Sequence, residues 1–151
     1  MICRFVFAVS LLTALPAGFA MADDRFAGPV RASVERVIDG DTLLVSARVW
    51  VGLVLTTRVR IRGIDTPETH RPQCDSERQM GLQATDKLNE LAGGSEVLLT
   101  DIETDKYGGR VDAAVTTAGG IDLAAAMVAS GLARPYDGRE RGDWCATGSV
   151  R

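Results

Sequence analysis

The sequence predicts a small α+β fold in which five strands close into a barrel and helices follow the third and fifth strands. The 151 residues are 46% hydrophobic and 25% charged, which is the composition of one ordinary globular domain. Five segments rich in β-branched residues and two with helical spacing are separated by glycines and polar turns. This order fits a closed Greek-key barrel of the OB type. An open α+β sheet is the alternative, because barrel closure leaves no local signature.

The first three strands are expected at residues 31–39, 42–51 and 54–63. The first alternates, with Val34 and Ile38 prominent. The second and third are rich in β-branched residues, and a glycine separates them. Three strands therefore precede any helical pattern.

A helix is expected after the polar loop that ends at Cys74. Ser76 and Gln79 are spaced as a capping box, which marks a helix start. Apolar side chains then recur at helical spacing, at Met80, Ala84, Leu88 and Leu91. Gly93 and Gly94 stop the helix.

Two strands and a second helix complete the fold. Residues 96–100 predict a short strand, and residues 110–117 predict the fifth strand after a glycine-containing turn. Asp122 can cap a helix that runs to residue 130, where Gly131 ends it.

Residues 1–22 have the pattern of a secretory signal peptide. Arg4 precedes an apolar run, and a small-x-small site ends at Ala22. We therefore expect cleavage after Ala22, export to the periplasm or the medium, and a single mature domain of residues 23–151. An uncleaved membrane anchor is the alternative, but the apolar run is short for a bilayer span.

The charge of the chain excludes a broad basic surface. The formal charge is −3, and cleavage removes one basic residue and no acidic one, which gives −4. A mildly acidic protein is not held on nucleic acid by bulk electrostatics. Any phosphate binding must come from a local cluster of arginines or from a metal ion.

Two cysteines, Cys74 and Cys145, stay in the mature chain once Cys3 leaves with the signal segment. An even pair in an oxidising compartment predicts a disulfide. Two buried free thiols are the alternative, which export disfavours.

Acidic side chains gather at two predicted turns. Asp39 and Asp41 follow the first strand, and Asp65 and Glu68 follow the third. Carboxylate and carbonyl oxygens suit a hard cation such as Ca²⁺ or Mg²⁺, whereas one histidine and no paired Cys/His spacing leave zinc without an obvious site. The alternative is that these acids only cap turns.

Arginines lie close to these acids in the sequence. Three of them share one face of the third strand, Arg58, Arg60 and Arg62. With Arg110 at the start of the fifth strand, they could grip a phosphate and neutralise developing charge. A solvated polar face is the alternative. A bulge at Gly63 is expected to bring Arg60 and Asp65 into one pocket.

Three segments in this order resemble the signature segments of the staphylococcal nuclease family. They are "VIDGDT", "VRIRGIDTPET" and "DKYGGR", and the similarity runs from about residue 32 to residue 145. The resemblance implies an OB barrel and Ca²⁺-dependent hydrolysis of phosphodiester bonds, with DNA or RNA as the substrate. We also expect a monomer without stable membrane association after signal cleavage.

The resemblance implies roles for individual residues. The calcium ligands would be Asp41, Asp65 and the carbonyl of Thr66. Glu68 would be the general base for the attacking water, and the phosphate-binding arginines would be Arg60 and Arg110. Contacts to the nucleotide would come from Lys106, Tyr107 and Tyr136. The chain departs from the founding member in its two glycines before Arg110 and in its C-terminal segment.

Two other functions have less support. A catalytically silent OB module that binds nucleic acid or protein would have lost some of these acids or arginines. A structural envelope protein with a loop-stabilising Ca²⁺ site would leave the arginines without a role. His70 is expected to be an exposed loop histidine, not a base.

Overall fold

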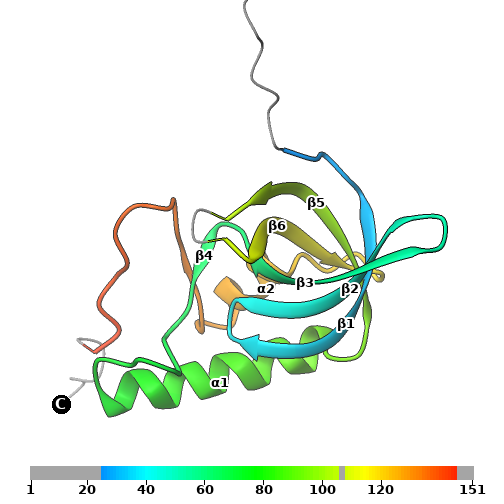
Figure 1. Ribbon diagram of the computed structural model, residues 1–151. Coiled ribbons are helices and arrows are strands. Elements are labelled where there is room, and N and C mark those ends of the chain that lie inside the picture. Colours follow the sequence, from blue (N-terminus) through cyan, green and yellow to red (C-terminus); the bar gives the residue numbers. More distant parts are fainter. Residues whose placement is uncertain (1–24, 106–107, 146–151) are drawn as a thin grey trace, which may run out of the picture.

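The computed structural model describes residues 25–105 and 108–145, and Figure 1 shows a barrel with α1 lying along one side of it. The barrel strands are neighbours in the order β1 (Val30–Asp39), β2 (Thr42–Trp50), β3 (Leu53–Ile61), β6 (Arg110–Thr117) and β5 (Glu96–Thr104), and β5 closes onto β1. The predicted five-stranded barrel is confirmed, and the open sheet is excluded. The predicted signal segment lies outside the described residues.

The pairing of the strands explains how a chain of this order closes. β1, β2 and β3 form an antiparallel meander, and β3 then pairs in parallel with β6, with Arg58 beside Arg110 and Arg60 beside Asp112. Antiparallel pairing of β5 with both β6 and β1 completes the ring. The parallel β3–β6 pair brings two segments that are 52 residues apart in the sequence into one register.

The core fills the barrel and the space between the barrel and its helices. Strand side chains such as Leu43, Val59, Val97 and Val115 point inward and are buried. Full burial of each such side chain stabilises the fold by about 1.5–3 kcal/mol. The alternation that predicted the strands is the alternation of inward and outward side chains.

The two helices each bury one apolar face. α1 (Asp75–Ala92) buries Ala84, Leu88 and Ala92, and α2 (Leu123–Ala129) buries Leu123 and Met127. The predicted cap of α2 is confirmed, because the Asp122 carboxylate accepts a hydrogen bond from the Ala125 N–H at 3.1 Å. No helix among the described residues is long and apolar enough to cross a membrane.

The predicted start of α1 is wrong. The N-cap is Cys74, whose Sγ accepts a hydrogen bond from the Glu77 N–H at 3.4 Å, and Ser76 lies inside the first turn. Cys74 has extended backbone and is bonded to Cys145, so the chain turns into the helix two residues before the expected cap. The disulfide prediction is confirmed.

The disulfide ties the start of α1 to the C-terminal segment. Cys74 and Cys145 are 71 residues apart in the sequence. Closing a loop of that length stabilises the folded chain by roughly 4 kcal/mol on the chain-entropy model. Figure 1 shows the C-terminal segment, orange to red, on the same side of the barrel as the first turn of α1.

Two features of the sheets were not predicted. β5 continues to Thr104 instead of ending at residue 100, through a register shift where Asp101 has a φ of 49°. A second, two-stranded sheet pairs β4 (Ile64–Asp65) with β7 (Arg134–Pro135). Strands of two residues are too short to show a period. This small sheet brings the C-terminal segment beside Asp65.

Candidate functional site

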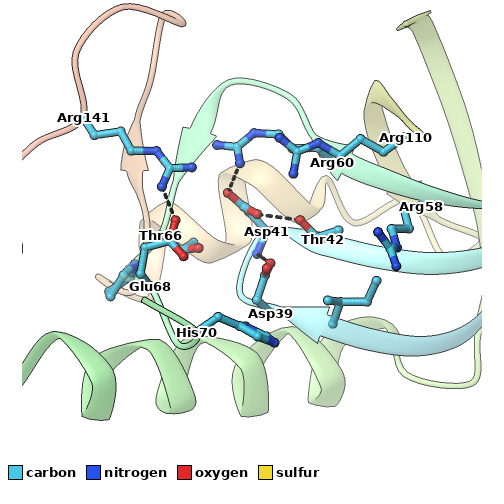
Figure 2. Close-up of a pocket in the computed structure, with 12 residues that line it drawn as sticks. Asp39, Asp41, Thr42, Arg58, Arg60, Thr66, Glu68, His70, Arg110 and Arg141 are labelled. Atoms are coloured by element: carbon cyan, nitrogen blue, oxygen red, sulfur yellow. Dashed lines mark hydrogen bonds and ion pairs between the residues drawn. The ribbon is translucent and has the colours of Figure 1, made fainter. Parts of the chain in front are cut away.

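A cavity of about 350 Å³ opens where the β1–β2 turn, the end of β3, the loop after β4 and the start of β6 meet. His70 lies beside the charged side chains that dominate its lining, as Figure 2 shows: Asp39, Asp41, Arg58, Arg60, Glu68, Arg110 and Arg141. Acids and arginines that lie far apart in the sequence therefore share one cavity.

The β1–β2 turn positions Asp41 at the floor of this cavity. A Cβ atom on Gly40 would lie 2.6 Å from the Cβ of Ala84, so only glycine lets the turn pack directly on α1. Asp41 is 4% exposed, and its Oδ1 accepts a hydrogen bond from the Thr42 hydroxyl at 2.8 Å. Its Oδ2 lies 2.9 Å from Nη1 of Arg60.

Burial of Asp41 disfavours its ionised form. Burial raises the pKa of Asp41 to about 7, while the Arg60 guanidinium lowers it and the neighbouring Asp39 raises it. A second positive charge beside this carboxylate would therefore favour the ionised form. A buried carboxylate with a raised pKa, whose ionised form a nearby cation would favour, is a candidate cation ligand.

The two arginines predicted to bind phosphate both line the cavity. Arg60 is almost fully buried on β3, and its Nη2 donates to the Ile64 carbonyl at 3.3 Å. Arg110 opens β6, and its Nε donates to Asp105 Oδ2 at 2.6 Å. The parallel pairing of β3 with β6 brings these two arginines to one cavity, which the sequence could not show.

Asp65 does not share the pocket of Arg60, so that part of the prediction is wrong. Gly63, with a φ of +83°, forms a tight turn between β3 and β4 instead of a bulge, and the turn directs Asp65 to an adjoining hollow of about 260 Å³. Asp65 is 2% exposed, and its Oδ2 accepts a hydrogen bond from Trp144 Nε1 at 3.0 Å. Thr66, Glu68 and Arg141 line both hollows.

Comparison with known proteins agrees with this arrangement. The family model described as "Staphylococcal nuclease homologue" matches residues 58–144 of the chain. The chain belongs to the staphylococcal nuclease family. The predicted family is thereby confirmed on a match that covers more than half of the chain.

A curated relative in the staphylococcal nuclease family is the protein named "Micrococcal nuclease" of Shigella flexneri. It is 35% identical over 115 residues, which make up 70% of this chain and 58% of the relative. The chain thus spans somewhat more than half the length of that relative.

The family resemblance implies a calcium ion, and the site contains donor atoms that suit one. Asp65 Oδ1 is buried and accepts no hydrogen bond from any described residue, although Nε of Arg141 lies 3.2 Å away. Asp41 is buried with a raised pKa, and Thr66, which follows Asp65 in the sequence, is buried as well. Hard carboxylate and carbonyl oxygens of this kind fit Ca²⁺.

The three carboxylates of this site, Asp41, Asp65 and Glu68, do not all come within 4.8 Å of one another. Among the described residues, only Cys74, Glu77 and Cys145 place three metal-ligating side-chain atoms within 4.8 Å of one another. The two cysteines form a disulfide, so that group offers no metal site. Asp41, Asp65 and Glu68 instead face guanidinium groups.

The residues predicted to contact the nucleotide are only partly described. Tyr136 lines a hollow of about 340 Å³ together with Arg60, Arg110 and Arg141. Lys106 and Tyr107 lie outside the described residues. His70 is exposed at the cavity, as expected, with Nδ1 2.9 Å from the Thr69 hydroxyl.

The sequence analysis missed Glu77, which supports the loop that carries Glu68. Glu77 is 5% exposed, and its two carboxylate oxygens accept hydrogen bonds from the backbone N–H groups of Glu68 at 3.3 Å and Gln73 at 2.6 Å. A Cβ atom on Gly81 would lie 2.8 Å from the Pro67 carbonyl oxygen, so the same loop packs closely on α1. The spacing of Cys74 and Glu77, three residues apart at a helix start, was the available signal.

Replacing Glu77 with alanine is expected to lower the free energy of unfolding by about 1–3 kcal/mol, because backbone donors of the Glu68 loop lose their acceptors. Urea unfolding of the mature protein measures this difference. Glu90→Ala is the matched control, because Glu90 is on the same helix, exposed, and paired with Lys87 at 3.0 Å. Equal losses in the two variants would contradict the role assigned to Glu77.

Arg141 was also missed. It lies in the glycine-rich C-terminal segment, where no spacing or periodicity marks it, yet its side chain reaches Asp65 and Glu68. This contact depends on the path of the C-terminal segment in the folded molecule, so no local signal could have identified Arg141.

Proposed function

We propose that the protein is an exported, monomeric Ca²⁺-dependent nuclease that hydrolyses phosphodiester bonds in DNA or RNA. The observation that carries the proposal is the convergence of Asp41, Arg60, Glu68 and Arg110 on one cavity. Membership of the nuclease family and the name of the Shigella flexneri relative support it. The acidic net charge agrees with a site that relies on local arginines.

In the proposed mechanism, Arg60 and Arg110 bind the scissile phosphate. Their guanidinium groups come from neighbouring strands and can donate to two different phosphate oxygens. They stabilise the extra negative charge that develops as water adds to phosphorus. Their ion pairs with Asp41 and Asp105 hold both side chains in place before substrate binds.

Glu68 accepts the proton of the attacking water in this mechanism. The water oxygen bonds to phosphorus, the bond from phosphorus to the ester oxygen breaks, and the leaving oxygen takes a proton from solvent. Asp41, Asp65 and the Thr66 carbonyl would hold Ca²⁺, which supplies positive charge to a phosphate oxygen. Tyr136, with Lys106 and Tyr107, would contact the nucleoside.

Digestion of DNA and RNA by the mature chain, residues 23–151, tests the proposal. We expect cleavage with Ca²⁺, none with a chelator, and a loss of at least about 10²-fold in Glu68→Gln. Glu90→Gln, which removes an exposed acid on α1, is the control and should cleave like the parent.

Two results would change the assignment. Equal cleavage with Ca²⁺ and with chelator would remove the cation from the mechanism. Binding of nucleic acid without cleavage of either polymer would favour a catalytically silent OB module.

A further inference from the structure

The last part of the described chain crosses the site and is fixed at both ends. We call residues 136–145 the C-terminal strap. At one end the Tyr136 N–H donates to the Gly63 carbonyl at 2.9 Å. At the other end Trp144 donates to Asp65, and Cys145 is bonded to Cys74. Residues 137–143, between these anchors, are exposed.

The strap places one cationic side chain among the carboxylates of the site. Arg141 Nη1 donates to Glu68 Oε1, and Arg141 Nε lies 3.2 Å from Asp65 Oδ1. Figure 2 shows its guanidinium above Thr66 and Glu68, approaching from the opposite side to Arg60. The side chain is 44% exposed, so it can leave this position without unfolding its surroundings.

The environment of Arg141 favours its charge. Burial acts to lower the pKa of Arg141, but the hydrogen bond to Glu68 and the charges of Asp65, Glu68 and Asp41 raise it. The guanidinium therefore lies in the combined field of the three carboxylates. A divalent cation at this site would be drawn by the same field.

Arg141, which bridges Asp65 and Glu68, and a divalent cation cannot use Asp65 at the same time. Calcium draws its oxygen ligands to about 2.3–2.6 Å, whereas a guanidinium between two carboxylates holds their oxygens farther apart. One oxygen of Asp65 already accepts from Trp144, so the other is the oxygen for which both compete. Two positive charges at one carboxylate would also repel each other.

We propose that Arg141 is an internal counter-ion that pairs with Glu68 and competes with the divalent cation for Asp65, and thereby sets the cation affinity of the site. The inference rests on the cation site of the proposed function. In the cation-loaded protein only the Arg141 side chain leaves, because the anchors of the strap do not involve it. Arg141 also borders the hollow lined by Arg60 and Arg110.

Calorimetric titration of the mature chain with Ca²⁺ at fixed ionic strength tests this proposal. Arg141→Gln is expected to bind Ca²⁺ at least about tenfold more tightly than the parent, since a competing charge is gone. Arg141→Lys, which keeps the charge, should return the affinity toward that of the parent. Arg139→Gln is the matched control, because this substitution removes the same charge from the same strap. Arg139 itself is 87% exposed and paired with Asp137.

Trp144 gives a second readout that does not depend on activity. In a Trp50→Phe background it is the single tryptophan of the chain, and its Nε1 donates to Asp65. Its emission should shift on Ca²⁺ addition with the same midpoint as the calorimetric titration, and the midpoint should move to lower Ca²⁺ in Arg141→Gln.

The outcomes separate this inference from the proposed function. Equal or weaker Ca²⁺ binding by Arg141→Gln, with the parent binding normally, would overturn the competition alone. Absence of Ca²⁺ binding by both proteins would overturn the cation site itself and the competition with it. A tenfold gain that Arg139→Gln reproduces would overturn the specific role of Arg141 and leave a general effect of net charge.

Discussion

Replacing Arg110 with glutamine is expected to lower kcat on DNA or RNA by about 10²–10³-fold, which is the cost of removing one charge-stabilising donor from a hydrolytic site. Arg110 and Arg60 lie on neighbouring parallel strands and line the same cavity, so in the proposed mechanism each would meet a different part of one phosphate. Because the charge of the phosphate grows only as water adds, the loss should fall mainly on kcat.

The conservative variant Arg110→Lys distinguishes this role from a structural one. A lysine can keep an ion pair with Asp105, where Arg110 Nε now donates at 2.6 Å, but it lacks the planar fork that binds two oxygens. We expect Arg110→Lys to unfold like the parent and to recover only part of the lost rate. Arg48→Gln, exposed on β2 outside the cavity, is the control. Cleavage by Arg110→Gln within twofold of the parent rate would remove Arg110 from the mechanism.

The second large effect is a loss of stability of the cation-free protein as pH rises. Burial disfavours the carboxylate and raises the pKa of Asp41 in the folded state from its ordinary value of 3.8 to about 7. The folded chain therefore holds this proton more tightly than the unfolded chain does. The stability that the Asp41 proton contributes is complete below pH 3.8 and is lost as pH rises to about 7. Above that pH the contribution of Asp41 to the free energy of unfolding should no longer change.

Unfolding of the parent and of Asp41→Asn, each with chelator at several pH values, measures the effect. Other carboxylates titrate in both proteins, so the quantity to follow is the difference between their unfolding free energies. That difference should move in favour of Asp41→Asn by a few kcal/mol between pH 4 and pH 7. Added Ca²⁺ should reverse the loss in the parent, because a cation favours the ionised carboxylate. A difference that does not change with pH would mean that Asp41 titrates normally in the folded protein.

Local patterns in the sequence predicted most of the fold. The barrel strands, both helices and the Asp122 cap come from periodicity, β-branched runs and helix-end residues, which reflect interactions between near neighbours in the chain. The start of α1 was misplaced because its N-cap is Cys74, whose sulfur both caps the helix and bonds to Cys145, 71 residues away. The β4–β7 sheet was missed because strands of two residues have no period.

The residues of the site also divide into those that local patterns identify and those that tertiary contacts place. Asp41, Arg60, Glu68 and Arg110 were identifiable because each stands in a short segment with a recognisable pattern. Asp65 was placed in the wrong pocket, because the turn at Gly63 and the hydrogen bond from Trp144 direct its side chain. Glu77 acts through a loop that packs on α1.

The sequence by itself determined the order of strands and helices, the family, and the acids and arginines that the chain brings to its site. Only the tertiary structure decided that a tail residue, Arg141, enters that site between Asp65 and Glu68. Strands and helices follow from the spacing of side chains a few residues apart. The position of a guanidinium at the end of an irregular segment follows from a disulfide and hydrogen bonds formed across the folded molecule, and these leave no mark on the local sequence.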